Sequence, residues 1–362
     1  MTTPKKIRVL VVDDSAVVRH AISDTLNRDP ELEVVATAGD PYIARDKILE
    51  LRPDVITLDI EMPRMDGLTF LRILQKHYPM RVVIVSSITV AGSKAALDAL
   101  ASGALDVIAK PTSAWSLGTL RDQLPERVKA AARARLLSPV ATPHSDHRAS
   151  EPAISTHFHP RQLIVVGAST GGTEAIKSVL TQLPAGLPPI CIVQHIPPGF
   201  SRAFAERLNQ CCAFPVREAA QGDEVKPGTA LIAPGDYHMS LLHKGDTYRA
   251  CLDQRPPRHH TRPSVDVLFE SAAECAGRNV LSVLLTGMGS DGARGMKALK
   301  QCGAQTIAQN EETCVVYGMP RAAVELGVVD HVLPLERIPQ GILIALRERS
   351  AAHSSRQTTI NS

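Results

Sequence analysis

Residues 163–172 have the sequence Leu163-Ile164-Val165-Val166-Gly167-Ala168-Ser169-Thr170-Gly171-Gly172. The four apolar residues at the start, two of them valines, predict a buried parallel strand. A turn of small residues follows, and residues 173–180 are predicted to form a helix. The spacing Gly167-x-Ser169-x-Gly171 is that of a nucleophile elbow, in which a serine lies on a sharp strand-to-helix turn. A phosphate-binding loop or an ordinary tight turn would use the same residues, so the turn alone leaves three interpretations open.

Two further polar residues follow apolar strands later in the chain. His195 comes after the predicted strand 189–193, and Asp291 comes after the predicted strand 280–285. Because the carboxyl ends of parallel strands lie along one edge of a sheet, we expect both residues to lie beside Ser169. A histidine can take the proton of a serine, and an aspartate can orient the imidazolium. Taken singly, His195 would suit a structural loop and Asp291 a helix cap, but together the three residues predict nucleophilic catalysis.

The helix after the serine turn would assist such a reaction. Its N-terminus offers unpaired N–H groups and a partial positive charge, which suit a developing oxyanion. We expect backbone N–H groups, including that of Met288, to hold the oxyanion, and Thr170 to belong to the same oxyanion or substrate site. A dinucleotide-binding site would need an acidic residue at the end of the second strand. Gln194-His195 lies there instead, and the glycine spacing is not G-x-G-x-x-G, which disfavours that alternative.

The composition excludes several classes of protein. The chain has 362 residues, 44% hydrophobic and 21% charged, and its length predicts two domains. A net charge of +3 gives no reason to expect binding to nucleic acid, and no apolar run reaches the roughly 20 residues of a membrane helix. The polar N-terminus does not resemble a signal peptide. Seven cysteines without a C-x-x-C pair favour reduced thiols. We therefore expect a cytoplasmic protein that does not insert into a membrane.

The first half of the chain alternates strands with helices. Apolar strands are predicted at residues 7–12, 33–38, 55–58, 82–85 and 106–109, each followed by a helical segment. Five strands that alternate with five helices predict a doubly wound parallel sheet. In such sheets the functional crevice lies at the carboxyl ends of the strands.

Polar residues occupy those strand ends: Asp13, Asp14, Asp59, Ser86 and Lys110. Three carboxylates in one crevice repel one another unless a cation lies between them, and hard oxygen ligands of this kind suit Mg²⁺. With the metal in place, Asp59 would act as a nucleophile toward phosphorus. Lys110 would then pair with the new charge, and Ser86 would hydrogen-bond to it. One aspartate alone would suit a solvated helix cap, but the whole set favours a phosphorylation site.

The motifs of this half resemble those of two-component receiver domains over about residues 5–125. The matching segments are Val11-Val12-Asp13-Asp14-Ser15, Leu58-Asp59-Ile60-Glu61-Met62-Pro63-x-Met65-Asp66-Gly67 and Lys110-Pro111. The resemblance implies a flavodoxin-like fold with Asp59 as the phosphoacceptor. It also implies a Mg²⁺ site made by Asp13, Asp14, Asp59 and Glu61, in which Asp14, Asp59 and the Glu61 carbonyl bind the ion directly. Val107 departs from the pattern, because many receivers carry an aromatic switch residue there.

From about residue 126 to residue 160 the pattern breaks. Residues 126–137 are rich in alanine and arginine and are predicted to extend the last helix outward, and a segment rich in proline, serine and histidine follows. That composition cannot bury enough apolar surface to fold, so we interpret it as a flexible tether. The irregular spacing of its histidines disfavours a metal site; they are His144, His147, His157 and His159.

The second half is predicted to be another doubly wound α/β domain with a largely parallel sheet. Segments 227–233, 237–242 and 247–252 are predicted to be short antiparallel strands that form a β-hairpin insertion. The final helix is expected at about residues 339–349. We assign residues 1–125 to a receiver domain, 126–160 to a flexible linker, 161–350 to a catalytic domain and 351–362 to a polar tail.

Long motifs in this half closely resemble the chemotaxis protein-glutamate methylesterase family, CheB. They are Gly167-Ala168-Ser169-Thr170-Gly171-Gly172, Gln194-His195-x-Pro197-Pro198-Gly199-Phe200, Arg262-Pro263-Ser264-Val265-Asp266, Leu285-Thr286-Gly287-Met288-Gly289-x-Asp291-Gly292 and Tyr317-Gly318-Met319-Pro320. The resemblance implies hydrolysis of glutamate methyl esters on chemoreceptors with release of methanol, and often deamidation of receptor glutamines. Mg²⁺ is implied for receiver phosphorylation, and no cofactor is implied for the hydrolysis.

The resemblance also implies partners and regulation. A CheA-type histidine kinase would be the phosphodonor, and the receiver would cover the active site until it is phosphorylated. The histidines of Pro257-Arg258-His259-His260-Thr261 lie where the family often has a His-rich loop, and their role is left open. Two other classes compete with this interpretation. A DNA-binding regulator lacks support, because there is neither a helix-turn-helix pattern nor a concentrated basic patch. The remaining alternative is a phosphorylation-controlled interaction module that is inert toward esters.

Overall fold

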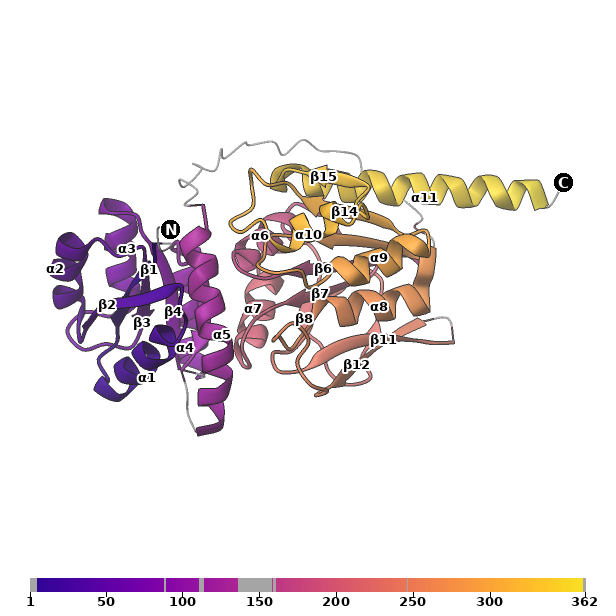
Figure 1. The fold of residues 1–362 in the computed structure, drawn as a ribbon. Helices are drawn as coiled ribbons and strands as arrows, with labels where there is room; N and C mark the ends of the chain where they lie inside the picture. Colours follow the sequence, from indigo (N-terminus) through magenta and orange to yellow (C-terminus); the bar gives the residue numbers. More distant parts are fainter. Residues whose placement is uncertain are drawn as a thin grey trace.

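The structure is a computed structural model that describes residues 5–87, 89–110, 114–135, 158, 161–245 and 247–360. These residues form two large open sheets flanked by helices and one small antiparallel sheet (Figure 1). The predicted α/β class, with a five-stranded parallel sheet followed by a second parallel sheet and a hairpin, is confirmed.

The N-terminal sheet has the strand order β2-β1-β3-β4-β5, and all neighbouring strands are parallel. Successive residues of β1 enter different apolar cores, with Leu10 in one and Val11 in the other. Both faces are therefore covered, as a doubly wound fold requires. The elements are β1 (Ile7–Val12), α1 (Ala16–Asn27), β2 (Leu32–Ala38), α2 (Pro41–Leu51), β3 (Val55–Asp59), α3 (Gly67–His77), β4 (Arg81–Ser86), α4 (Val90–Ala101), β5 (Asp106–Ala109) and α5 (Ala114–Arg133).

Helix α5 corrects the predicted start of the linker. Residues 126–133 belong to this helix, and Val128 and Ala131 are fully buried in the apolar core of the N-terminal sheet. The predicted extension of the last helix beyond residue 125 is confirmed, and α5 continues through Pro125. The predicted outward direction of this extension is wrong, because the small alanine side chains let the helix pack closely against the N-terminal sheet. The predicted tether with its four histidines lies outside the described residues.

The second large sheet has the order β15-β14-β13-β6-β7-β10-β8, again with every neighbouring pair parallel. Segment 227–233, predicted to be antiparallel, instead contributes a parallel strand, because residues 230–232 pair with two strands of this sheet. The strands are β6 (Leu163–Ala168), β7 (Ile190–Gln194), β8 (Val216–Glu218), β10 (Ala230–Ile232), β13 (Val280–Leu284), β14 (Gln305–Gln309) and β15 (His331–Leu333).

The predicted hairpin forms the separate antiparallel sheet. Strand β11 (His238–Lys244) pairs with β12 (Thr247–Asp253), which pairs with β9 (Glu224–Val225). The helices of this half are α6 (Gly172–Leu180), α7 (Phe200–Asn209), α8 (Val265–Ala276), α9 (Ala293–Gln301), α10 (Met319–Glu325) and α11 (Ile338–Ile360), with short 3₁₀ helices η1 (Gly277–Asn279) and η2 (Leu335–Arg337).

Helix α11 is longer than predicted and extends away from the sheets (Figure 1). Among the residues whose burial is described, Leu346 is the last buried residue of the helix. The prediction ended the helix at about residue 349, but the helix continues to Ile360 and includes most of the predicted polar tail. Residues 347–360 contain neither glycine nor proline, so nothing in the chain stops the helix. None of the helices described is long and apolar enough to cross a membrane.

The two halves of the chain pack against each other, and α5 lies between their large sheets in Figure 1. The backbone N–H of Gly171 donates to the Leu105 carbonyl at 3.2 Å, and that of Arg135 donates to the Val315 carbonyl at 3.1 Å. An exposed ion pair joins Arg207 to Asp98 at 3.0 Å. These contacts bring the loops between β4 and α5 to the edge of the second sheet that carries Ser169.

Candidate active site

Ser169 lies on the turn between β6 and α6, as the nucleophile-elbow pattern predicts. Gly171 caps α6 with a φ of 76°, a conformation that other residues rarely adopt. The serine backbone is held on both sides: its N–H donates to the Thr286 carbonyl at 3.0 Å, and its carbonyl accepts from the Gln194 amide at 2.8 Å. These hydrogen bonds therefore fix the backbone of the turn and the position of the serine side chain. Gln194, one residue before the predicted histidine, was assigned no role from the sequence.

The structure brings Ser169, His195 and Asp291 to one edge of the sheet. Strands β13, β6 and β7 are neighbours, and these residues follow β13, β6 and β7 in the order Asp291, Ser169 and His195. His195 Nε2 lies 2.8 Å from Asp291 Oδ2, and both side chains are at least 96% buried. Ser169 and His195 line one cavity of about 500 Å³. The sheet order, which the sequence did not specify, is what makes the three residues neighbours.

The serine and the histidine do not yet share a hydrogen bond. Within the described residues, Ser169 Oγ has no hydrogen-bond partner, while His195 Nε2 faces Asp291 and, at 3.4 Å, Thr261 Oγ1. Since Nε2 is engaged by the carboxylate, Nδ1 is the ring nitrogen left to receive the serine proton. Catalytic hydrogen bonds of this kind are often long before substrate binds.

The carboxylate of Asp291 is held by the N-terminus of α8. Its Oδ1 accepts from Ser264 Oγ at 2.8 Å and from the Asp266 N–H at 2.9 Å, and its Oδ2 accepts from the Val265 N–H at 2.7 Å. Burial opposes ionisation, but the bonds from His195 and from these donors prevail and lower the pKa of Asp291 to about 2. The aspartate is therefore anionic at neutral pH. The sequence motif containing Ser264 was noted, but this supporting role was not predicted.

Two residues that line the cavity have a backbone N–H without a hydrogen-bond partner among the described residues. In the described part of the chain, the N–H groups of Thr170 and Met288 donate to no other group, whereas the neighbouring N–H of Gly287 donates to the Val316 carbonyl at 3.0 Å. Gly287 also approaches the serine closely, because a Cβ there would lie 2.7 Å from Ser169 Cβ. Acyl transfer uses backbone N–H donors of this kind to stabilise an oxyanion.

Helix α5 of the N-terminal half forms the opposite wall of the cavity with Asp122, Gln123, Glu126 and Arg127. Below it, the buried Asp106 links both halves of the chain. Its Oδ2 accepts from Thr170 Oγ1 at 2.6 Å, and its Oδ1 accepts from Arg127 at 2.6 Å. Asp106 is the first residue of β5, and nothing in the sequence pattern singled it out.

The predicted acidic cluster lies at the carboxyl edge of the N-terminal sheet. Carboxylate oxygens of Asp13, Asp14 and Asp59 lie within 4.8 Å of one another, and Lys110 Nζ reaches Asp13 at 3.0 Å and Asp59 at 2.7 Å. Burial and the nearby Asp13 raise the pKa of Asp59 to about 6, although Lys110 opposes the shift. Converging hard oxygens in a half-buried crevice fit Mg²⁺.

Other predicted receiver residues lie around this cluster. The Glu61 N–H donates to Asp59 Oδ1 at 3.2 Å, so its backbone adjoins the carboxylates. The buried Ser86 hydroxyl donates to the Gly92 carbonyl at 3.4 Å rather than to Asp59. Val107, in place of an aromatic residue, is buried in the apolar core.

Comparisons with known proteins show which families the two halves of the chain match. The family model described as CheB methylesterase matches residues 164–342, and the response regulator receiver domain model matches residues 9–120. The chain is 52% identical over 339 residues to a Syntrophus aciditrophicus protein named protein-glutamate methylesterase/protein-glutamine glutaminase 2, with 93% of this chain and 98% of that protein covered. It is 51% identical over 342 residues to a protein-glutamate methylesterase/protein-glutamine glutaminase of Salmonella typhimurium, with 93% and 96% covered.

A solved structure matches the second half. The crystal structure of the Thermotoga maritima CheB methylesterase catalytic domain is 41% identical and has a TM-score of 0.50, covering 52% of this chain and 97% of that one.

Proposed function

The chain belongs to the CheB methylesterase family, and we propose that it is a phosphorylation-activated serine esterase that hydrolyses glutamate methyl esters on chemoreceptors in the cytoplasm. Deamidation of receptor glutamines is the second activity, in keeping with the double name of its relatives. The observation that carries the proposal is the buried 2.8 Å contact between His195 and Asp291 beside Ser169.

The mechanism follows from these side chains. His195 takes the proton of Ser169 Oγ, which attacks the ester carbonyl and forms a tetrahedral intermediate. The N–H groups of Thr170 and Met288 stabilise its oxyanion, and Asp291 stabilises the imidazolium. The carbon–oxygen bond to the methoxy group breaks, and methanol leaves with the proton from His195. Water, activated by the same histidine, then cleaves the acyl-enzyme and releases the glutamate carboxylate. With a glutamine substrate the leaving group is ammonia.

The N-terminal half is the regulatory part of the proposal, and it extends through α5 to about residue 135. Asp59 attacks the phosphoryl group of a CheA-type histidine kinase or a small phosphodonor, and the donor's bond to phosphorus breaks. Asp13, Asp14, Asp59 and the Glu61 carbonyl would hold Mg²⁺, which supplies positive charge to the carboxylates and the phosphoryl group. Lys110 pairs with the phosphoryl charge, and Ser86 turns to hydrogen-bond to it.

Strand β5 connects phosphorylation to the active site. Lys110 follows the strand and binds Asp59, while Asp106 begins it and binds Thr170 next to the serine. Lys110 also lines a second cavity, of about 250 Å³, together with His195 and Arg262. A movement of Lys110 would therefore shift β5, which has only four residues. At the other end of this strand, Asp106 binds Thr170 of the catalytic half. Separation of α5 from the cavity opens the path to Ser169.

The test of this proposal is methanol release from methylated receptor membranes, with and without Mg²⁺ and a small phosphodonor. In the wild-type protein the donor should raise the rate by a factor between about 5 and 150, the usual range for coupling between two sites. Asp59→Asn should keep the unphosphorylated rate and lose the increase, because it lacks the nucleophile. If the phosphodonor stimulates Asp59→Asn as much as the wild type, the proposed control by phosphorylation of Asp59 is wrong. If the wild type releases no methanol from any matched receptor, the alternative of an interaction module that is inert toward esters is favoured.

A second prediction concerns the link between the two halves. Asp106→Ala should raise the unphosphorylated rate by a factor between about 10 and 150, because a buried hydrogen bond to a charged group contributes roughly 1.5–3 kcal/mol to the closed arrangement. Asp98→Ala is the matched control: it removes a partly exposed ion pair across the same interface, which contributes about 0–1 kcal/mol. Both rates are read as methanol release without phosphodonor, and circular dichroism checks the fold. No increase in Asp106→Ala, or a larger one in Asp98→Ala, would contradict the prediction.

A further inference from the structure

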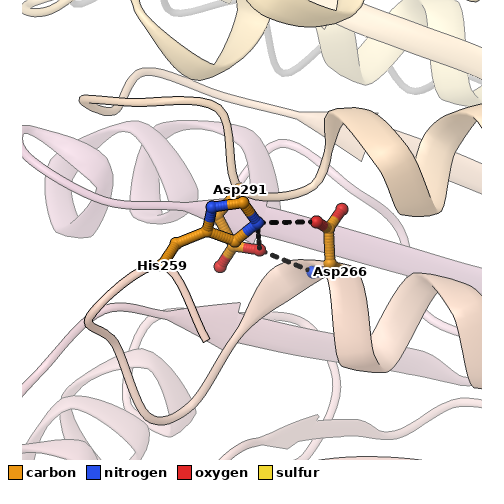
Figure 2. Close-up of side chains that lie close together, drawn as sticks. All are labelled: His259, Asp266 and Asp291. Atoms are coloured by element: carbon orange, nitrogen blue, oxygen red, sulfur yellow. Dashed lines mark hydrogen bonds and ion pairs between the residues drawn. The ribbon is translucent and has the colours of Figure 1, made fainter. Parts of the chain in front are cut away.

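We propose that His259 is a positioning residue that keeps Asp291 and His195 in their working geometry by binding Asp266. The proposal rests on the proposed esterase site and assigns a role to a histidine that the sequence left open. His259 Nε2 lies 2.9 Å from Asp266 Oδ2 and 4.0 Å from Asp291 Oδ1 (Figure 2). The imidazole thus lies against two carboxylates, one of which holds the catalytic histidine.

The loop that carries His259 is built to hold it there. The backbones of Arg258 and Thr261 exchange two hydrogen bonds, of 3.0 and 2.9 Å, and close a tight turn with His259 and His260 at its tip. Both tip residues have positive φ, 50° and 60°, which costs a non-glycine residue free energy. Arg258 also anchors the turn to Glu270 of α8 at 2.7 Å. Because the backbone bonds close this turn and Arg258 ties it to α8, the imidazole of His259 is fixed in place.

Asp266, in the first turn of α8, and Asp291, in the loop before α9, are two buried carboxylates that lie close together. Asp266 directly contributes to the support of Asp291, because its N–H donates to Asp291 Oδ1 at 2.9 Å. Its own carboxylate accepts from the Gly295 N–H at 2.7 Å and from His259. Burial and the charge of Asp291 raise the pKa of Asp266, while the bond from His259 opposes that shift. The histidine therefore offsets the repulsion between the two carboxylates and fixes the first turn of α8.

The same three side chains do not fit a metal site, although their ligand atoms lie within 4.8 Å of one another. Asp291 already accepts four hydrogen bonds, from Ser264, Val265, Asp266 and His195. Three of these donors are N–H or O–H groups of the α8 cap, which a cation would have to displace. A positioning role uses the contacts as they are.

The contacts of His259 set the direction of the expected effect. The charged and titratable groups that face His259 are Arg258, Asp266, Asp291 and His195, and across the cavity Asp122, Glu126 and Arg127 of α5. Loss of the His259 donor removes one of the two hydrogen bonds that the Asp266 carboxylate accepts, so the first turn of α8, whose N–H groups hold Asp291, is fixed less firmly. Asp291 then orients His195 less well, which slows the chemical step and leaves substrate binding unchanged.

The test measures the labelling rate of Ser169 by a fluorophosphonate probe from pH 5 to pH 9, in the full-length protein with phosphodonor, alongside methanol release. His259→Leu should lower the labelling rate and kcat about tenfold across this range, with KM little changed. His259→Gln, whose amide still donates toward Asp266, should restore the wild-type labelling rate and kcat. His259→Asn, which is too short to reach, should behave like the leucine variant.

The outcomes separate this proposal from the proposed function. A wild-type kcat in His259→Leu, or equal losses of kcat in the leucine and glutamine variants, would overturn the positioning role. If the wild type is labelled at Ser169 but releases no methanol, the esterase proposal fails while the labelling profiles still test His259. Thermal melting of each variant shows that it is folded, and if His259→Leu does not fold, the comparison of His259→Asn with His259→Gln decides.

Discussion

Replacing Ser169 with alanine is expected to lower methanol release by a factor on the order of 10⁴ or more, because the acyl-enzyme route then has no nucleophile. What is left is the contribution of the oxyanion donors and of substrate binding. The fold should be unaffected, since Ser169 Oγ makes no hydrogen bond to the described residues and the turn is held by the backbone contacts to Thr286 and Gln194.

The measurement is methanol release by phosphodonor-treated protein, together with labelling by the fluorophosphonate probe. Ser178→Ala is the matched control, because Ser178 lies on the same helix, α6, but does not line the cavity. The control should keep the wild-type rate and its label. Retention of more than a hundredth of the wild-type rate by Ser169→Ala would assign the nucleophile to another group.

Replacing Asp291 with asparagine is expected to lower kcat by a factor of about 10³–10⁴. Four donors converge on this side chain, and a carboxylate can accept from all of them. An amide has one acceptor oxygen, and its NH₂ group would face either His195 or the N–H groups at the start of α8. The histidine would then lose the partner that fixes its tautomer and stabilises its charged form.

This prediction is read from kcat across pH, with Ser264→Ala as a graded control. Ser264 supplies one of the four donors and does not touch His195, so its removal should cost about 1 kcal/mol, or a few-fold in rate. Because the pKa of Asp291 is lowered to about 2, the aspartate itself does not titrate between pH 5 and pH 9. An asparagine variant with more than a tenth of the wild-type rate would show that the carboxylate is dispensable.

The sequence predicted most of the fold because its signals were local. Short apolar runs, each ending in a polar residue, indicated the strands and the edge at which chemistry would lie, and Asp13, Asp59 and Lys110 indeed meet at one such edge. The prediction was wrong where a helix or strand lacks a clear hydrophobic periodicity. The polar end of α11 is helical without an apolar stripe, and β10 is a short strand whose direction is set by its neighbours.

By itself, the sequence determined that Ser169, His195 and Asp291 each follow a strand. Strands and turns can be predicted in this way because both depend on residues that are consecutive in the chain. Tertiary structure decided the rest. The order β13-β6-β7 made the three residues neighbours, and the N-terminus of α8 directed its donors to Asp291. Packing of the N-terminal sheet against the cavity joined Asp106 to Thr170, and the turn at residues 258–261 placed His259 on Asp266. These contacts join groups far apart in the chain, and since their energies depend on distance and burial, they exist only once the sheets have assembled.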